Sequence, residues 1–79
     1  MPSVLVKDGY RFFFWSNEND EPAHIHVTKG GDEAKFWLNP IELVYSYGFA
    51  ARETRVIHRM IEAHHALLEG AWNDYFGAN

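Results

Sequence analysis

An aromatic run close to the N-terminus constrains the fold more than any other feature of this chain. The pair Asp8-Gly9 precedes Tyr10–Trp15, which reads YRFFFW, and an Asp-Gly pair between apolar stretches is typical of a two-residue β-hairpin turn. Side chains alternate between the two faces of a strand, so this strand carries bulky apolar groups on both sides. We expect a hairpin at residues 4–15 whose second strand is central in a sheet that is covered on both faces.

A second hairpin is predicted around Gly30-Gly31, because paired glycines reach positive φ without steric cost. Pro22–Val27 favours a strand before this turn, and Glu33–Leu38 after it alternates apolar with other residues. Asn39-Pro40 then interrupts the pattern, since proline has no N–H to donate within a central strand. Ile41–Tyr45 resumes a β-like composition, and we expect a fifth strand there.

The periodicity changes after residue 50. Apolar or aromatic residues and one histidine recur from there at spacings of three and four, as on one face of an amphipathic helix. They are Val56, Ile57, Met60, Ile61, His64, Leu67, Leu68, Ala71, Trp72 and Tyr75. We therefore predict a single α+β domain over residues 1–79, with a twisted antiparallel sheet of four or five strands within residues 3–46 and one long C-terminal helix at about 50–76 packed on it.

The length of this helix creates a mismatch with the sheet. About 26 helical residues span roughly 39 Å, whereas a five-stranded sheet of short strands has a diagonal of roughly 30 Å. Either the helix breaks, near Gly70, or its end overhangs and exposes Trp72, Tyr75 and Phe76. Such an exposed apolar patch is typical of a contact with a protein partner or with a second copy of the chain.

Composition excludes several classes of protein. With no cysteine among 79 residues, the chain has neither a disulfide nor a thiolate metal site, so the aromatic core must replace the staples that small domains often need. The formal charge of −4 and only seven Lys and Arg argue against a broad phosphate-binding surface. No apolar run approaches the roughly 20 residues of a membrane span, and we expect a cytoplasmic protein that has no membrane contact.

The candidate site is the pair His24 and His26. One residue separates them, so both side chains emerge on the same face of the predicted strand, with backbones about 7 Å apart. One ring could act as base and the other as acid in RNA cleavage, while Arg11 or Lys35 steadies the phosphate charge. The alternative is that both are half-buried histidines hydrogen-bonded to backbone or carboxylates.

Metal binding needs a third ligand beside the two histidines. Zinc in a catalytic site usually has three protein ligands, and in this chain the third would be Asp, Glu or one of the helical histidines. Among these, His58 and His65 share a helical face with Glu62 and Glu69, a stripe that is typical of a solvated face. No spacing such as His-Glu-x-x-His occurs, so we predict no metal and no cofactor.

Several stretches together resemble a known family. The Tyr10–Ser16 strand, the Glu21–Val27 segment with its His-Ile-His-Val core, Glu33–Leu38 and Ala71-Trp72-Asn73 are similar to those of the small bacterial family called domain of unknown function 4160. The resemblance covers nearly the whole chain. It implies a bacterial cytoplasmic protein whose gene often lies beside that of a second small protein, as in toxin–antitoxin pairs.

This chain departs from the family at the start of the helix, where Ala50 replaces a capping Ser, Thr or Asn. Loss of the cap would cost about 1 kcal/mol of helix stability unless another group caps the helix, and Glu53 could help because it faces the positive end of the helix dipole.

Two functions follow as hypotheses. The first is a toxin-like member of a two-gene system that acts on or binds RNA through the face of His24 and His26. The second is a non-enzymatic protein-interaction module in which the histidines are structural. The first requires that both imidazoles share an accessible surface.

Overall fold

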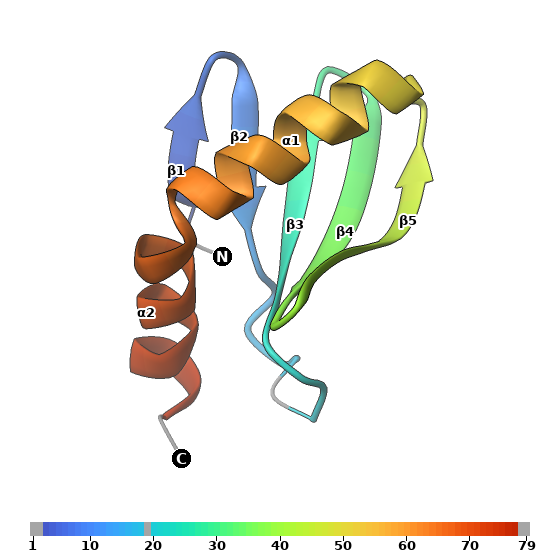
Figure 1. Cartoon of the computed structure of the whole chain (residues 1–79). Helices are drawn as coiled ribbons and strands as arrows, with labels where there is room; N and C mark the ends of the chain where they lie inside the picture. The colour runs from blue at the N-terminus through green and yellow to red at the C-terminus, as the bar shows by residue number, and fades with distance from the viewer. Residues whose placement is uncertain (1–2, 19, 78–79) are drawn as a thin grey trace.

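Five strands form one antiparallel sheet, and two helices follow it (Figure 1). The computed structural model describes residues 3–18 and 20–77. The strands are β1 (Ser3–Lys7), β2 (Tyr10–Phe13), β3 (His24–Lys29), β4 (Asp32–Leu38) and β5 (Ile41–Tyr47), and they lie side by side in chain order. The helices are α1 (Ala51–Ala63) and α2 (His65–Phe76). The predicted α+β class and the fifth strand are confirmed.

The turn between β1 and β2 has the conformation that its residues favour. Asp8 and Gly9 both have positive φ, 54° and 85°, as the central residues of a type I′ turn require. The flanking residues Lys7 and Tyr10 face each other across the hairpin. The Asp-Gly pair therefore sets the register of the first hairpin, as predicted.

One face of the sheet packs against the helices and forms the core, and we call it the helix face. Its buried side chains come from alternate strand positions, together with Ile57, Ile61, Leu68 and Trp72 of the helices. From the sheet and its continuation they are Tyr10, Phe12, Phe14, Ile25, Val27, Ala34, Phe36 and Leu38. This is the alternation that period-two patterning predicts.

The opposite face carries the candidate residues, and we call it the histidine face. Cross-strand neighbours on it include Phe13 with His26, His26 with Lys35, and Lys35 with Tyr45. In the described part of the chain, α1 crosses the other side of the sheet (Figure 1).

The prediction of one long helix is wrong, because the chain bends at His64. This residue has φ −115° and ψ 22°, outside the helical region, and it separates α1 from α2. The longest dimension of the molecule is 35 Å, so a straight helix of roughly 39 Å would overrun the sheet. The bend instead brings α2 down beside β1 (Figure 1), and Gly70, where a break was expected, lies within α2.

The bend also removes the expected exposed patch at the end of the helix. Trp72 is only 6% exposed, and its ring lies 5.5 Å from that of Phe14 and 4.3 Å from that of Phe76. Phe76 is half-buried, so of the three residues only Tyr75 is exposed. The expectation that Trp72 is exposed is therefore wrong, because Trp72 completes the core.

At the start of α1, Ala50 provides no side-chain cap. The Ala50 N–H donates to Glu53 Oε1 at 3.2 Å, and the carboxylate lies in the first turn, where the sequence suggested that it faces the positive end of the helix dipole. Of the two helices in the described part of the chain, neither combines the length and the apolar content that crossing a bilayer needs.

Candidate functional site

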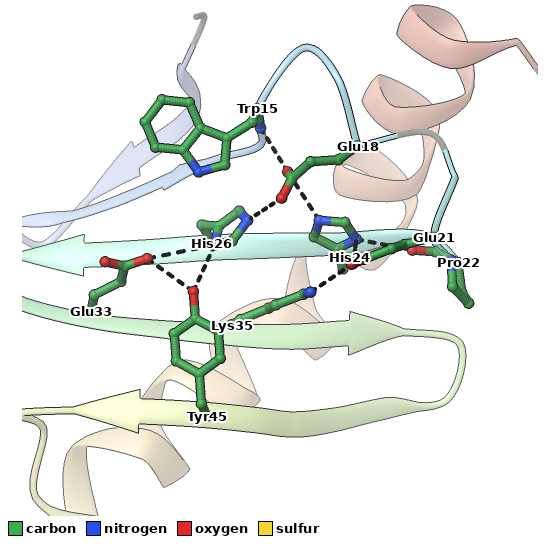
Figure 2. Close-up of polar contacts among 9 residues, drawn as sticks. All are labelled: Trp15, Glu18, Glu21, Pro22, His24, His26, Glu33, Lys35 and Tyr45. Atoms are coloured by element: carbon green, nitrogen blue, oxygen red, sulfur yellow. Dashed lines mark hydrogen bonds and ion pairs between the residues drawn. The ribbon is translucent and has the colours of Figure 1, made fainter.

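The chain between β2 and β3 folds back over the first residues of β3. We call residues 14–18 and 20–23 the connecting segment. β2 ends at Phe13, which pairs with His26, so His24 has a strand neighbour only on the β4 side, at Trp37. The connecting segment lies over this end of β3 and places Glu18 between the two imidazole rings (Figure 2).

Glu18 bridges His24 and His26 with its two carboxylate oxygens. Oε2 lies 2.8 Å from His26 Nε2, and Oε1 lies 3.0 Å from His24 Nε2. The Trp15 backbone N–H donates to Oε1 at 2.8 Å, which fixes the carboxylate in this position. One acidic side chain therefore ties the connecting segment to both candidate histidines.

The other ring nitrogens face outer partners. His24 Nδ1 lies 2.9 Å from the Pro22 carbonyl oxygen, which can only accept, so Nδ1–H is the donor. His26 Nδ1 lies 3.4 Å from the Tyr45 hydroxyl, and that hydroxyl donates its proton to Glu33 Oε2 at 3.1 Å. The Tyr45 oxygen is then the acceptor for His26 Nδ1–H.

Both imidazoles are enclosed. His24 is 0% and His26 4% exposed. The ring of His24 packs against Trp72 at 4.8 Å and Trp37 at 5.9 Å, and His26 stacks on Phe13 at 5.5 Å. In residues 3–18 and 20–77, no cavity opens beside these rings. The two side chains share a face, as strand alternation predicted, but the accessible surface that catalysis requires is not formed.

Arg11 and Lys35 lie on the histidine face but each has other partners. Arg11 Nε donates to Ser3 Oγ at 2.6 Å, and its guanidinium lies 4.5 Å from the centre of the Phe13 ring. Lys35 Nζ donates to Glu21 Oε1 at 2.6 Å and lies over the Trp37 ring. The structure thus assembles all four sequence-predicted site residues on one face, with Lys35 already neutralised by a carboxylate.

The electrostatics of the site favour an ionised Glu18. Burial acts to raise the pKa of Glu18, but the hydrogen bonds from His26 and the Trp15 N–H, together with the nearby His24 ring, outweigh it, and the pKa is lowered overall. The hydrogen bond from Lys35 likewise lowers the pKa of Glu21. Burial, followed by the hydrogen bond to Glu33, raises the pKa of Tyr45 to about 12.

The helical histidines lie apart from this site. His58 and His65 donate through Nε2 to the backbone carbonyls of Ile41 and Leu38, at 3.3 Å and 2.7 Å. They therefore fasten the helices to the β4–β5 turn. The expectation of a purely solvated stripe is wrong for these two half-buried residues.

Glu18 is the residue that sequence reasoning missed. Across residues 3–18 and 20–77, Glu18, His24 and His26 are the set of three His, Asp or Glu side chains whose ligand atoms all lie within 4.8 Å of one another. The third ligand considered from the sequence was Asp, Glu or a helical histidine, and the structure supplies a glutamate. The signal was present as an acidic run directly before the His-x-His strand, but it also fits an exposed loop.

Comparison with known proteins gives one match. No curated protein and no solved structure matches the chain. The sequence model of the family described as Domain of unknown function (DUF4160) matches residues 9–73, which include the strands β2 to β5, the connecting segment, α1 and most of α2. The match spans most of the chain and includes every candidate site residue. This protein therefore belongs to the DUF4160 family.

Proposed function

We propose that this protein is a non-enzymatic protein-interaction module in which His24 and His26 are structural. The burial of both imidazoles carries the proposal. A general acid or base must come within about 2.6–3.2 Å of the proton that it transfers, and here neighbouring side chains enclose both rings. Their hydrogen bonds already connect β3 to the connecting segment.

The two histidines connect β3 to the segment that covers it. The contacts of Glu18 hold the connecting segment against β3 (Figure 2). The salt bridge between Lys35 and Glu21 adds a second attachment of the same segment. These contacts are of the kind that fix loop geometry and leave binding to other surfaces.

The outer edge of β5 is the binding surface that we propose. β5 is the last strand in the sheet order, and Leu43, Val44 and Tyr47 on it are between 39% and 68% exposed. An edge strand with apolar side chains can pair with an extended strand of another protein, whose backbone supplies affinity and whose side chains supply specificity. The proposed partner is the second small protein of a two-gene system.

The test measures the affinity of the chain for the product of the neighbouring gene by calorimetry. Val44→Lys places a charge at the edge and should weaken binding by about tenfold or more, or about 1.4 kcal/mol. Leu67→Lys introduces the same charge at an exposed position of α2 and should leave binding unchanged. Equal affinity of the wild type and Val44→Lys would remove β5 as the binding surface, and a concentration-dependent mass of the chain alone would point to self-association.

A toxin-like protein that acts on RNA is the second proposal. The common location of Arg11, His24, His26 and Lys35 on the histidine face supports it. The discriminating experiment compares growth of cells that express the wild type and the double variant His24→Ala, His26→Ala. Loss of toxicity in a variant that still folds and still binds its partner favours the RNA-acting protein. Unchanged toxicity eliminates the histidines as catalytic groups.

A further inference from the structure

One buried ring nitrogen at the centre of the histidine face, Nε2 of His24, lies beside a carboxylate but has no hydrogen-bond partner within the described part of the chain. Because Nδ1 of His24 donates to Pro22 O, the Nε2 of a neutral ring is an acceptor, and Glu18 Oε1 lies 3.0 Å from it. His26 differs, since its Nε2 is hydrogen-bonded to Glu18 Oε2 at 2.8 Å. Two acceptors this close in a buried site repel, so a proton or a metal ion must lie between His24 and Glu18.

A proton on Nε2 of His24 would relieve only part of this conflict. Within residues 3–18 and 20–77, the Nε2 atom of His24 is buried and has no hydrogen-bond partner. The distance of 3.0 Å to Glu18 Oε1 is short, but the oxygen lies outside the direction in which a ring N–H donates. A proton there would leave a buried donor unsatisfied, which costs more than an ordinary hydrogen bond gains. A metal ion bound by several atoms does not need Glu18 Oε1 to lie along the direction of a ring N–H bond.

We propose that Glu18, His24 and His26 bind one divalent transition-metal ion, for which Zn²⁺ is the best match. Two neutral imidazoles and a carboxylate form an established zinc ligand set. One ligand atom from each of the three residues lies within 4.8 Å of the other two, and tetrahedral zinc with bonds of about 2.0–2.2 Å needs its ligand atoms roughly 3.4 Å apart. Small shifts of the three side chains would therefore form a site with three protein ligands.

The outer partners of both rings are those that metal-binding histidines use. Such histidines almost always donate the other ring N–H to a backbone carbonyl, a carboxylate or a polar oxygen, which fixes the tautomer and aims the lone pair at the metal. His24 uses the Pro22 carbonyl, and His26 uses the Tyr45 hydroxyl, itself bonded to Glu33 (Figure 2). Lys35 would repel a cation, but it is paired with Glu21.

The bound ion would act as a crosslink between two segments of the chain. It joins the connecting segment, through Glu18, to β3, through His24 and His26, in a chain of 79 residues that has no cysteine. Small domains often depend on a metal or a disulfide for this purpose. This role is independent of the proposed partner surface on β5.

The experiment starts from the full chain stripped of metal with EDTA and titrated with Zn²⁺. Calorimetry should give one site per chain, and Zn²⁺ at about a hundred times its Kd should raise the Tm by roughly 10 °C or more. Co²⁺, used as a spectroscopic probe, should develop the visible absorption of a tetrahedral N/O site. Chelation should reverse each change.

Variants locate the site. Glu18→Gln should weaken Zn²⁺ binding by at least about a hundredfold, because loss of even an outer partner of a metal ligand costs roughly ten- to a hundredfold. Tyr45→Phe, which removes an outer partner and no ligand, should cost about tenfold. The matched control is the double variant His58→Ala, His65→Ala, which removes two histidines elsewhere and should bind Zn²⁺ as the wild type does.

Three results would overturn the proposal. The first is a wild-type Tm that neither EDTA nor Zn²⁺ changes, which would leave protonated imidazoles as the explanation. The second is a Co²⁺ spectrum without tetrahedral character. The third is loss of binding in the His58, His65 control, which would place the ion on the helices. If Glu18→Gln does not fold, the Tm and Co²⁺ measurements on the wild type still decide.

Discussion

The two faces of the sheet are built from the same strands but are stabilised by different interactions. On the helix face, alternate residues such as Phe12, Ile25 and Phe36 pack against α1 and α2 and exclude water. On the histidine face, the intervening residues meet a connecting segment through a carboxylate and two imidazoles. Burial on the first face follows from apolar area. Burial on the second combines aromatic contacts with hydrogen bonds and charge, and the hydrogen bonds have strict geometry.

Because of this difference, the two faces should tolerate different kinds of substitution. The helix face tolerates many apolar side chains of similar volume, since its contacts are not directional. The histidine face depends on individual groups, because removal of one partner leaves another buried and unsatisfied. The histidine face should therefore respond to pH, chelators and single polar substitutions, and the helix face should respond mainly to changes of volume.

Truncation of a core aromatic residue should give the largest effect. Phe36→Ala on the helix face should lower the free energy of unfolding by about 4 kcal/mol through lost burial and the cavity that remains. Phe13→Ala on the histidine face is the matched variant, and its loss should be smaller, because the polar side chains of Arg11 and His26 contact that ring in place of a fully apolar core. Urea unfolding followed by circular dichroism measures both, and an equal or greater loss at Phe13 would contradict the contrast between the faces.

Removal of the Glu18 charge should give the next largest effect. In metal-free protein, Glu18→Gln should lower the free energy of unfolding by about 2 kcal/mol, because hydrogen bonds to charged groups contribute roughly 1.5–3 kcal/mol. The comparison is Glu42→Gln on β5, an exposed carboxylate, which should have almost no effect. A neutral result for Glu18→Gln would mean that the connecting segment is held in another way.

The dependence of stability on pH should give the smallest effect. The pKa of Glu18 in the folded protein lies below its ordinary value of 4.5, so the unfolded chain binds the proton more readily. The contribution of Glu18 to stability is therefore present above about pH 4.5 and is lost as the pH falls through its folded-state pKa.

In metal-free protein, the fall of unfolding free energy below this pH should be shallower for Glu18→Gln than for the wild type. Glu21→Gln should flatten it less, since the Glu21 side chain is much more exposed. Identical pH profiles of wild type and Glu18→Gln would contradict the lowered pKa.

Local patterns were sufficient to predict most of the sheet. Asp8-Gly9 and Gly30-Gly31 marked two turns, and alternation assigned Phe12, Ile25 and Phe36 to one face, because these features depend on neighbours in sequence. The bend at His64 was missed because neither glycine nor proline marks it. It arises from the need of Leu68 and Trp72 to reach the core, which is a tertiary requirement.

Only part of the site could be predicted from the sequence, because only that part depends on the spacing of residues along a strand. His24 and His26 could be placed on one face from their spacing alone, together with Arg11 and Lys35. The position of Glu18 depends on the path of the connecting segment, which has no periodicity to predict it. Enclosure of the rings also depends on Trp72 and Trp37, which reach His24 from other elements.

The central claim is that His24 and His26 are enclosed, and selective chemical modification tests it most directly. Diethyl pyrocarbonate modifies accessible neutral imidazoles, and peptide mass spectrometry of the metal-free native protein would give the rate at each histidine. The account predicts that His58 and His65 react while His24 and His26 stay protected until urea unfolds the chain. Native-state modification of His24 and His26 at the rate of His58 would contradict it and would restore both rings as candidates for catalysis.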